Sequence, residues 1–367
     1  MPRILHTADI HLDAPFHFMG VRGQIHRRQI RETFARIAKL AADDRYDLLL
    51  IAGDLFDDGA PSRDTQHFVI STLGKLPLPV CILPGNHDSL DKGSIYHRIE
   101  LPENVHLLRE RPSYLTFPEL DLTVAGSPLL SRYDGDSQLK GIFRGPATRW
   151  FVAMAHGNMQ GFGPFESNSR PIEPASIAAT GADYVALGDW HAHADFSQQG
   201  VRACYSGAPE PTKMSETNTG RVIAIDLSDR GVVVETKQVG AIEARSLELD
   251  VTNCHESDIA ARIKAEAGSR RMLTVRLTGM KSAASLLDLE ALHQATADHF
   301  YCLQLNDDAT LGLMGIHSNE YPESFVIGQY VRLMAERVEQ AADDRQRRIA
   351  EQALQLGVAL LQGQKVL

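Results

Sequence analysis

Short hydrophobic runs, separated by polar turns, recur through the first 240 residues of the chain. The runs are rich in Val, Ile and Leu, and several are nearly continuous rather than alternating, which is typical of strands buried on both faces. They predict strands at 3–8, 47–52, 78–83, 120–126, 150–155, 183–187, 201–205, 221–227 and 231–239.

Two amphipathic segments lie between these runs. In the first, Ile30, Phe34, Ile37 and Ala41 fall on one face of a helix, and residues 64–74 form a second such segment. Strand–helix–strand alternation with buried strands predicts an α/β core. The antiparallel-looking run from 201 to 239 could extend the same sheet or form a second one.

The pattern changes near residue 240. "ARSLELDV", a helix near 256–268, "RMLTVRLTG", a helix near 284–298 and "FYCLQLND" alternate as β-α-β-α-β, which predicts a small α+β domain over 241–306. Residues 307–324 are interpreted as a linker.

The stretch from 325 is helical and carries two apolar stripes. One comprises Ile327, Val331, Met334, Val338 and Ala341, and the other comprises Ile349, Ala353, Leu356 and Leu360. We expect residues 325–367 either to bind a partner protein or to pack on the α+β domain.

Composition narrows the class of protein. A chain of 367 residues suggests two domains, and 43% hydrophobic with 23% charged residues fits a globular protein. Without a long apolar run or an apolar leader, we expect a cytoplasmic protein that does not cross a membrane. The four scattered cysteines are interpreted as buried thiols. A net charge of −10 argues against nucleic-acid binding by bulk charge alone, but not against a local basic path.

Five polar clusters follow five of the predicted strands. They are "ADIH" (Asp9, His11), "AGDLFD" (Asp54, Asp57), "PGNHD" (Asn86, His87, Asp88), "AHGN" (His156) and "GDWHAH" (Asp189, His191, His193). Each alone could be a turn or a helix cap. Together they predict one functional crevice, because loops at the carboxyl edge of an α/β sheet converge.

The residue types suit two metal ions. Carboxylate, imidazole and amide donors without thiolate fit Mn(II), Fe(II), Zn(II) or Mg(II). A carboxylate such as Asp54 can bridge two cations about 4 Å apart, which would bind a phosphate ester and activate a bridging water. His87 is the candidate acid for the leaving oxygen, and Asp57 and Asp88 are expected to orient ligands.

These motifs resemble those of the calcineurin-like metallophosphoesterases: D-x-H, G-D-x-x-D, G-N-H-D, a later H and G-H-x-H. "ILHTADIHLDAPF", "LPGNHDS", "DYVALGDWH" and "CYSGAPEPTKMSE" are similar to the SbcD/YhaO-type DNA repair nuclease branch. Over residues 1–240 the resemblance implies a four-layer β-sandwich flanked by helices. The α+β segment would then be a capping domain, followed by the C-terminal helices.

The resemblance also implies the ligands. One metal would take Asp9, His11, Asp54 and His191, and the other would take Asp54, Asn86, His156 and position 189. The family has histidine at that position, and this chain has Asp189. An insertion after Gly188 would make His193 the ligand instead. Asp189 would favour Mn(II), and we expect Asp189→His to bind the second metal at least as well.

The resulting hypothesis is a metal-dependent DNA phosphodiesterase, an SbcD-like exonuclease or endonuclease. Its implied partners are DNA and an SMC-like ATPase of the SbcC type, and a homodimer is left open. Two alternatives stay open: a phosphatase or phosphodiesterase for nucleotides or small molecules, and a weakly active scaffold subunit of the ATPase complex. The motifs themselves serve the nuclease and the small-molecule hypotheses equally. Asp189 is the feature that keeps the scaffold hypothesis open, and the other motif positions, which are intact, argue against it.

Overall fold

The computed structural model describes the chain except residues 163–169, 253, 282–286, 312–321, 323–324 and 362–367. The chain divides into two compact units, residues 1–244 and residues 245–367. Each is described by itself.

The first unit contains two six-stranded sheets. The first sheet has the order β14 (Gly231–Gln238), β13 (Arg221–Ser228), β1 (Arg3–Thr7), β2 (Leu48–Ala52), β3 (Val80–Leu83) and β4 (Val105–Leu107). Strands β1 to β4 are parallel, and β13 pairs antiparallel with both β1 and β14. The hairpin over 221–238 therefore extends the first sheet.

The second sheet has the order β11 (Ala194–Asp195), β12 (Arg202–Tyr205), β10 (Tyr184–Gly188), β7 (Trp150–His156), β6 (Leu122–Gly126) and β5 (Ser113–Phe117). Its four central strands are parallel, and the edge strands β5 and β11 are antiparallel to their neighbours. A short parallel pair, β8 (Asn158–Met159) with β9 (Pro171–Ile172), lies beyond β7.

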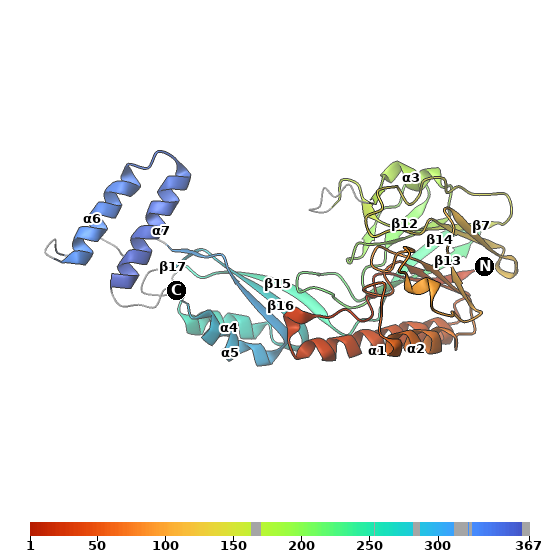
Figure 1. Cartoon of the computed structure of the whole chain (residues 1–367), viewed down its shortest axis with the longest axis horizontal. Helices are drawn as coiled ribbons and strands as arrows, with labels where there is room; N and C mark the ends of the chain where they lie inside the picture. Colours follow the sequence, from red (N-terminus) through yellow and green to blue (C-terminus); the bar gives the residue numbers. More distant parts are fainter. Residues whose placement is uncertain (163–169, 253, 282–286, 312–321, 323–324, 362–367) are drawn as a thin grey trace. The chain divides into compact units, whose positions relative to one another are not determined.

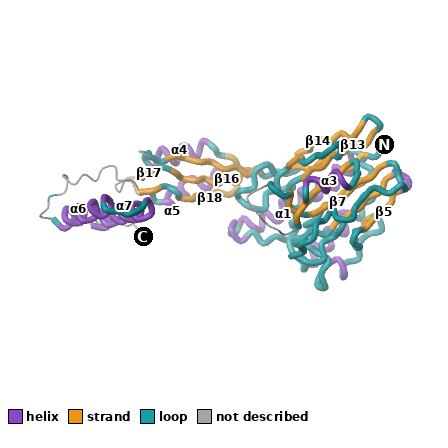
Figure 2. Tube along the Cα trace, turned by 90° about the horizontal axis from the view of Figure 1, so that it is seen from above, coloured by secondary structure: helices purple, strands orange, loops and turns teal. Residues whose placement is uncertain are grey.

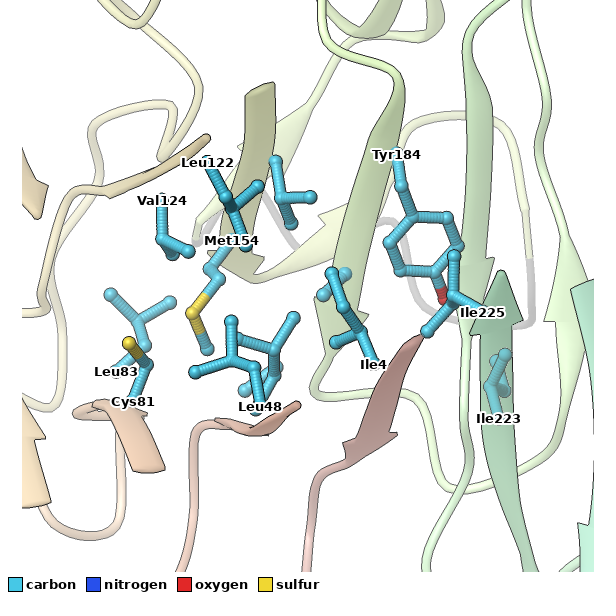
Figure 3. Packing of buried hydrophobic residues seen from close by; sticks show 14 of the residues in the cluster. Ile4, Leu48, Cys81, Leu83, Leu122, Val124, Met154, Tyr184, Ile223 and Ile225 are labelled. Carbon is cyan, nitrogen blue, oxygen red and sulfur yellow. The ribbon is translucent and has the colours of Figure 1, made fainter. Parts of the chain in front are cut away.

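A single apolar core lies between the two sheets. Figure 3 shows Ile4, Leu48 and Cys81 of the first sheet facing Val124 and Met154 of the second. All five are fully buried. This packing buries the inner face of each sheet. The central strands β2, β3, β7 and β10 are buried on their outer faces as well, which explains their nearly continuous apolar runs.

Helices cover the outer faces. Figure 1 shows α1 (Arg22–Asp43) and α2 (Arg63–Leu73) on one side of the sheets and α3 (Pro174–Ala179) on the other. Ser62 caps α2 by accepting a hydrogen bond from the Thr65 N–H. Helix, sheet, sheet and helix form the four layers, so the predicted fold class is confirmed.

Sequence patterns missed the weaker elements of this unit. Strand β4 has three residues and β5 is half exposed at a sheet edge, so neither gives a continuous apolar run. The unit also has single-turn helices η1 (His17–Met19), η2 (Ile95–His97) and η3 (Pro118–Leu120).

The second unit begins with a three-stranded sheet. Strands β15 (Glu243–Asp250), β16 (Gly268–Thr278) and β18 (Phe300–Asp307) form it, and Figure 1 shows α4 (Glu256–Ala265) and α5 (Leu289–Thr296) on one face. Ile259, Ile263 and Leu292 of the helices join the core of this sheet. This part of the unit also contains the single-turn helix η4 (Ala297–His299). Strands β17 (Met280–Lys281) and β19 (Thr310–Leu311) form a separate two-stranded parallel sheet.

Three predicted boundaries in this unit differ from the structure. The helix expected near 284–298 is α5 over Leu289–Thr296, followed by η4, and residues 284–286 lie outside the described part of the chain. The helix expected to 268 ends at Ala265, because the chain enters β16 at Gly268. The segment expected as a linker contains β19, and residues 312–321 and 323–324 lie outside the described part of the chain.

The C-terminal helices α6 (Val326–Glu339) and α7 (Asp344–Leu361) lie side by side in Figures 1 and 2. Val331 and Met334 of α6 pack against Leu354 and Val358 of α7, with Ile327 beside them. The first apolar stripe, on α6, is therefore buried mainly against α7. Ile349 and Leu360 of the second stripe stay about half exposed.

Within the described residues, no helix has the length and apolar character needed to cross a membrane. The four cysteines are free thiols; Cys81 and Cys204 are buried, and Cys254 and Cys302 are partly buried. The prediction of buried thiols therefore holds fully for two of them.

Candidate metal centre

The predicted site residues follow neighbouring strands of both sheets. Asp9 and His11 follow β1, Asp54 follows β2, and Asn86 with His87 follow β3. In the second sheet, His156 ends β7, and Asp189 with His191 follow the adjacent β10. All eight residues therefore lie at the carboxyl edges of parallel strands, where ligands bind in open α/β sheets.

Backbone hydrogen bonds join these loops to one another. The Asp9 N–H donates to the Gly53 carbonyl at 3.1 Å, and the His11 N–H donates to the Asp54 carbonyl at 3.0 Å. Across the sheets, the Asp189 N–H donates to the Asp9 carboxylate at 3.0 Å. The site is therefore held together by main-chain contacts from both sheets.

Four of the predicted ligands have a positive backbone φ. The angle is 55° at Asp9, 51° at His11, 51° at Asp54 and 95° at Asp189. Non-glycine residues in this region cost free energy and concentrate at functional sites. Next to Asp54, Gly53 has φ 97°, and a Cβ there would lie 1.9 Å from His156 Nδ1, so only glycine lets the histidine approach.

A first group of donors forms around His11. Asp9, His11 and His191 bring ligand atoms within 4.8 Å of one another. His11 Nε2 lies 3.2 Å from His191 Nε2 and 3.7 Å from Asp54 Oδ2.

A second group forms around His156 Nε2. This nitrogen lies 2.9 Å from Asn86 Oδ1, 3.4 Å from Asp54 Oδ2 and 3.6 Å from Asp189 Oδ1. His193 points elsewhere, since its Nδ1 lies 2.9 Å from the Tyr205 carbonyl oxygen. The geometry therefore brings Asp189, and not His193, beside the second group.

These spacings fit divalent cations. In a six-coordinate ion with bonds of about 2.1 Å, neighbouring donors are about 3 Å apart and opposite donors about 4.2 Å. The donor separations in both groups fall at or between these values, and Asp54 Oδ2 takes part in each. The donors present can hold two ions with Asp54 between them.

The electrostatics of the site also favour cations. Asp9, Asp54 and His156 are almost fully buried. Burial alone would lower the pKa of His156, but the carboxylates of Asp54, Asp189 and Asp9 raise it to about 10. The pKa of Asp54 is lowered, because His156, His11 and His87 together outweigh burial. The buried carboxylates therefore create a field that binds positive charge.

Supporting groups fix the orientation of each histidine. His156 Nδ1 donates to the Ala52 carbonyl at 2.9 Å, and His11 Nδ1 lies 3.0 Å from Asp57 Oδ1. His191 Nδ1 lies 2.7 Å from Glu216 Oε1. In each case the Nε2 atom is left to face the donor groups, as in metal-binding histidines with carboxylate or carbonyl partners.

Sequence reasoning missed Glu216. Burial acts against ionisation, but the hydrogen bond and charge of His191 lower the pKa of Glu216 to about 2. The residue lies in a loop after β12, within no strand or helix, so no periodicity marked it. Its place within the "CYSGAPEPTKMSE" stretch was the available signal.

We predict that Glu216→Gln weakens binding of the first metal by about 10- to 100-fold, because the amide supports the His191 ring less well than the carboxylate does. Metal content after dialysis against a graded Mn(II) buffer measures this. The control is Glu243→Gln, which replaces a carboxylate by an amide at a position outside the centre. Unchanged affinity in Glu216→Gln would show that Glu216 does not support the ligand.

Asp88 connects the loops after β2 and β3. Its carboxylate accepts hydrogen bonds from the N–H groups of Leu55, Phe56 and Gly85 and from the Tyr96 hydroxyl, at 2.7 to 3.2 Å. Burial and the nearby Asp54 raise the pKa of Asp88 to about 6. Asp88 therefore holds together the two loops that carry Asp54 and Asn86.

Asp88→Ala should lower the free energy of unfolding by about 3–5 kcal/mol, because it leaves several buried donors without an acceptor. Tyr96→Phe removes one of the four contacts and should cost about 1 kcal/mol. Urea denaturation of the metal-free proteins compares the two. Equal losses in both variants would contradict the assigned role.

His87 stands at the rim of the centre. Its Nδ1 donates to the Asp57 carbonyl at 2.6 Å, and its ring packs edge-on against His11 with ring centres 4.7 Å apart. Burial lowers its pKa despite the opposing effect of Asp54. With Nδ1 bonded to a carbonyl, Nε2 is the atom that can exchange a proton with a substrate.

Two cavities open at the centre. One of about 440 Å³ is lined by His11, Asp54, Asn86, His87 and His191 among others. The other, of about 580 Å³, shares Asp189, His191 and Lys213 with the first and adds Arg170 and Trp190. Volumes of this size are typical of ligand sites.

Residues 2–193 match the family model for calcineurin-like phosphoesterases. The chain belongs to this family. The match covers more than half of the chain and includes every residue of the two donor groups, so the predicted family is confirmed. Calcineurin-like phosphoesterases use divalent metals, in agreement with the donors found here.

Three bacterial and archaeal proteins are among those similar to this chain in sequence. The uncharacterized metallophosphoesterase YhaO of Bacillus subtilis is 26% identical over 68% of this chain and 63% of its own length. The DNA double-strand break repair protein Mre11 of Aeropyrum pernix is 28% identical over 68% of this chain and 64% of its own length. The SbcD subunit of the nuclease SbcCD of Bacillus subtilis is 23% identical over 61% of this chain and 65% of its own length. The chain thus spans less than two thirds of each relative.

Proposed function

We propose that this protein is a metal-dependent phosphodiesterase that hydrolyses DNA, as an SbcD-like exonuclease or endonuclease, with two Mn(II) ions in the candidate metal centre. The observation that carries the proposal is the shared position of Asp54, whose Oδ2 lies within 3.7 Å of His11 Nε2 and 3.4 Å of His156 Nε2. One carboxylate between two donor groups is the arrangement that a two-metal phosphoesterase requires.

In this proposal Asp9, His11, His191 and Asp54 would hold one ion. Asn86, His156, Asp189 and Asp54 would hold the other. When bound, such ions neutralise a phosphate ester and supply a water that ionises near neutral pH. The protein holds the donors rigidly, since their loops are tied by main-chain hydrogen bonds.

His87 would act on the leaving oxygen. Its ring is fixed by the Asp57 carbonyl and lines the cavity that also contains Asp54 and His191. Because Nδ1 donates its hydrogen to the Asp57 carbonyl, Nε2 carries a proton only in the imidazolium form of His87, and that form would donate to the oxygen that leaves a phosphate held at the centre.

DNA is favoured over a small phosphate ester by two observations. Relatives named as DNA repair and nuclease proteins match the chain over about two thirds of its length. The second cavity also adds Trp190, Arg170 and Lys213 beside Asp189 and His191, and an aromatic ring with cationic side chains suits the base and phosphate of a neighbouring nucleotide. An ATPase of the SbcC type in the cytoplasm is the proposed partner, with residues 325–367 as its binding element.

A substrate comparison tests the proposal. The full chain, loaded with Mn(II), is incubated with end-labelled linear duplex DNA, single-stranded DNA, bis-p-nitrophenyl phosphate and a mononucleotide. We expect the Mn(II)-loaded chain to cleave DNA, and we expect EDTA to abolish the cleavage because it chelates the metal. Hydrolysis of the mononucleotide without DNA cleavage would favour the small-molecule alternative, and no hydrolysis of any substrate would favour the scaffold alternative.

A further inference from the structure

Arg170 is a basic residue that no motif marked, and it lies against the second donor group. Its Nη2 lies 3.2 Å from Asp189 Oδ1, the same oxygen that lies 3.6 Å from His156 Nε2. The side chains are only 12% and 10% exposed. An ion pair this well shielded from water interacts more strongly than a surface pair.

The backbone fixes Arg170 next to the strand that delivers His156. The Asn158 N–H donates to the Arg170 carbonyl at 3.0 Å, where β8 pairs with β9. A Cβ on Gly157 would lie 2.3 Å from that carbonyl oxygen, so a larger residue at 157 would push Arg170 away. Arg170 itself has φ 54°.

The guanidinium also has a second hydrogen-bond partner. Its Nη1 donates to the Arg132 carbonyl at 3.2 Å. Backbone and side chain together therefore hold a permanent positive charge against Asp189, at the edge of the cavity of about 580 Å³.

We propose that Arg170 is a positioning residue that cancels the charge of Asp189, so that the pair takes the electrostatic place of one neutral histidine at the second metal. The inference rests on the two-metal site of the proposed function. The carboxylate supplies the oxygen donor, and the guanidinium keeps the total charge of the donor group at the value that a histidine would give.

The pair reverses an expectation drawn from the sequence. Replacing Asp189 by histidine removes an anion but leaves Arg170 buried beside the cation. An unpaired guanidinium a few ångströms from a divalent ion repels it strongly in a site with little water. Asp189→His alone should therefore bind the second metal worse, and not at least as well as the sequence alone suggests.

Mn(II) binding to the metal-free full chain, measured by isothermal titration calorimetry, tests the proposal without DNA. We expect Asp189→His to bind the second Mn(II) at least about tenfold more weakly than the unmodified chain. Adding Arg170→Gln to it should restore the affinity to within about threefold. Lys213→Gln in the same Asp189→His background is the matched control: it removes a cation from the same cavity, one whose Nζ pairs with Glu216 at 3.9 Å.

Three results would overturn the pair. They are Asp189→His binding the second ion as tightly as the unmodified chain, Arg170→Gln failing to restore binding, and Lys213→Gln restoring it equally. Circular dichroism confirms folding, and Asp189→Asn replaces Asp189→His if the latter does not fold. An unmodified chain that binds only one Mn(II) would refute the two-metal site itself, and the pair with it. DNA cleavage that fails while the expected titrations hold would refute only the DNA substrate.

Discussion

Asp54→Asn should reduce Mn(II)-dependent phosphodiester hydrolysis by at least about 1,000-fold, because in the proposed site this carboxylate would be the donor shared by both metal positions. Its Oδ2 lies 3.7 Å from His11 Nε2 and 3.4 Å from His156 Nε2. The amide keeps the shape of the side chain but loses the charge that would bridge two cations. Initial rates with bis-p-nitrophenyl phosphate at saturating Mn(II) measure the effect.

Asparagine is the suitable replacement because Asp54 has φ 51°, a conformation that asparagine tolerates better than alanine. The amide oxygen of the new side chain can also still accept the hydrogen bond that the His87 N–H donates to Asp54 Oδ1 at 2.9 Å. The fold should therefore survive, and thermal unfolding of the metal-free variant checks this. A correctly folded variant that hydrolyses the ester at the rate of the unmodified chain would exclude a shared carboxylate.

His87→Asn should lower turnover of DNA by about 100-fold or more while both metals still bind, as expected when a proton donor is lost. Asparagine can donate from its side-chain amide to the Asp57 carbonyl, as His87 Nδ1 does at 2.6 Å. It cannot deliver a proton to the leaving oxygen. Single-turnover cleavage at saturating Mn(II) isolates this chemical step.

The identity of the leaving group distinguishes an acid from a ligand. An ester with a good leaving group needs little proton donation, so the loss in His87→Asn should be much smaller with bis-p-nitrophenyl phosphate than with DNA. Equal losses on both substrates, together with a reduced metal content, would instead make His87 a metal ligand.

The sequence predicted the parts of the fold that follow from burial on both faces. Strands β2, β3, β7 and β10 are nearly continuous apolar runs, β1 is buried along most of its length, and the chemistry-bearing residues directly follow or end these strands. Strands β4 and β5 were missed because short or half-exposed edge strands give no continuous run. The α6–α7 hairpin shows a related limit: its stripes predicted an apolar contact but not that each helix is the other's partner.

The candidate site was predictable where motif and strand end coincide. It was not predictable for residues that reach the centre from irregular loops. Glu216 contacts His191 from a position 25 residues along the chain, and Arg170 contacts Asp189 from 19 residues before it. Neither lies in a periodic element, so only the folded chain shows that they touch the ligands. Arg170 in particular balances the negative charge that Asp189 would otherwise add to the second donor group.

The anomalous scattering of Mn(II) in crystals of the full chain tests the central claim most directly. The account predicts two peaks about 4 Å apart, both next to Asp54. One peak should contact Asp9, His11 and His191, and the other should contact Asn86, His156 and Asp189. A single peak, or a second peak bound by His193 and distant from Asp189, would contradict it.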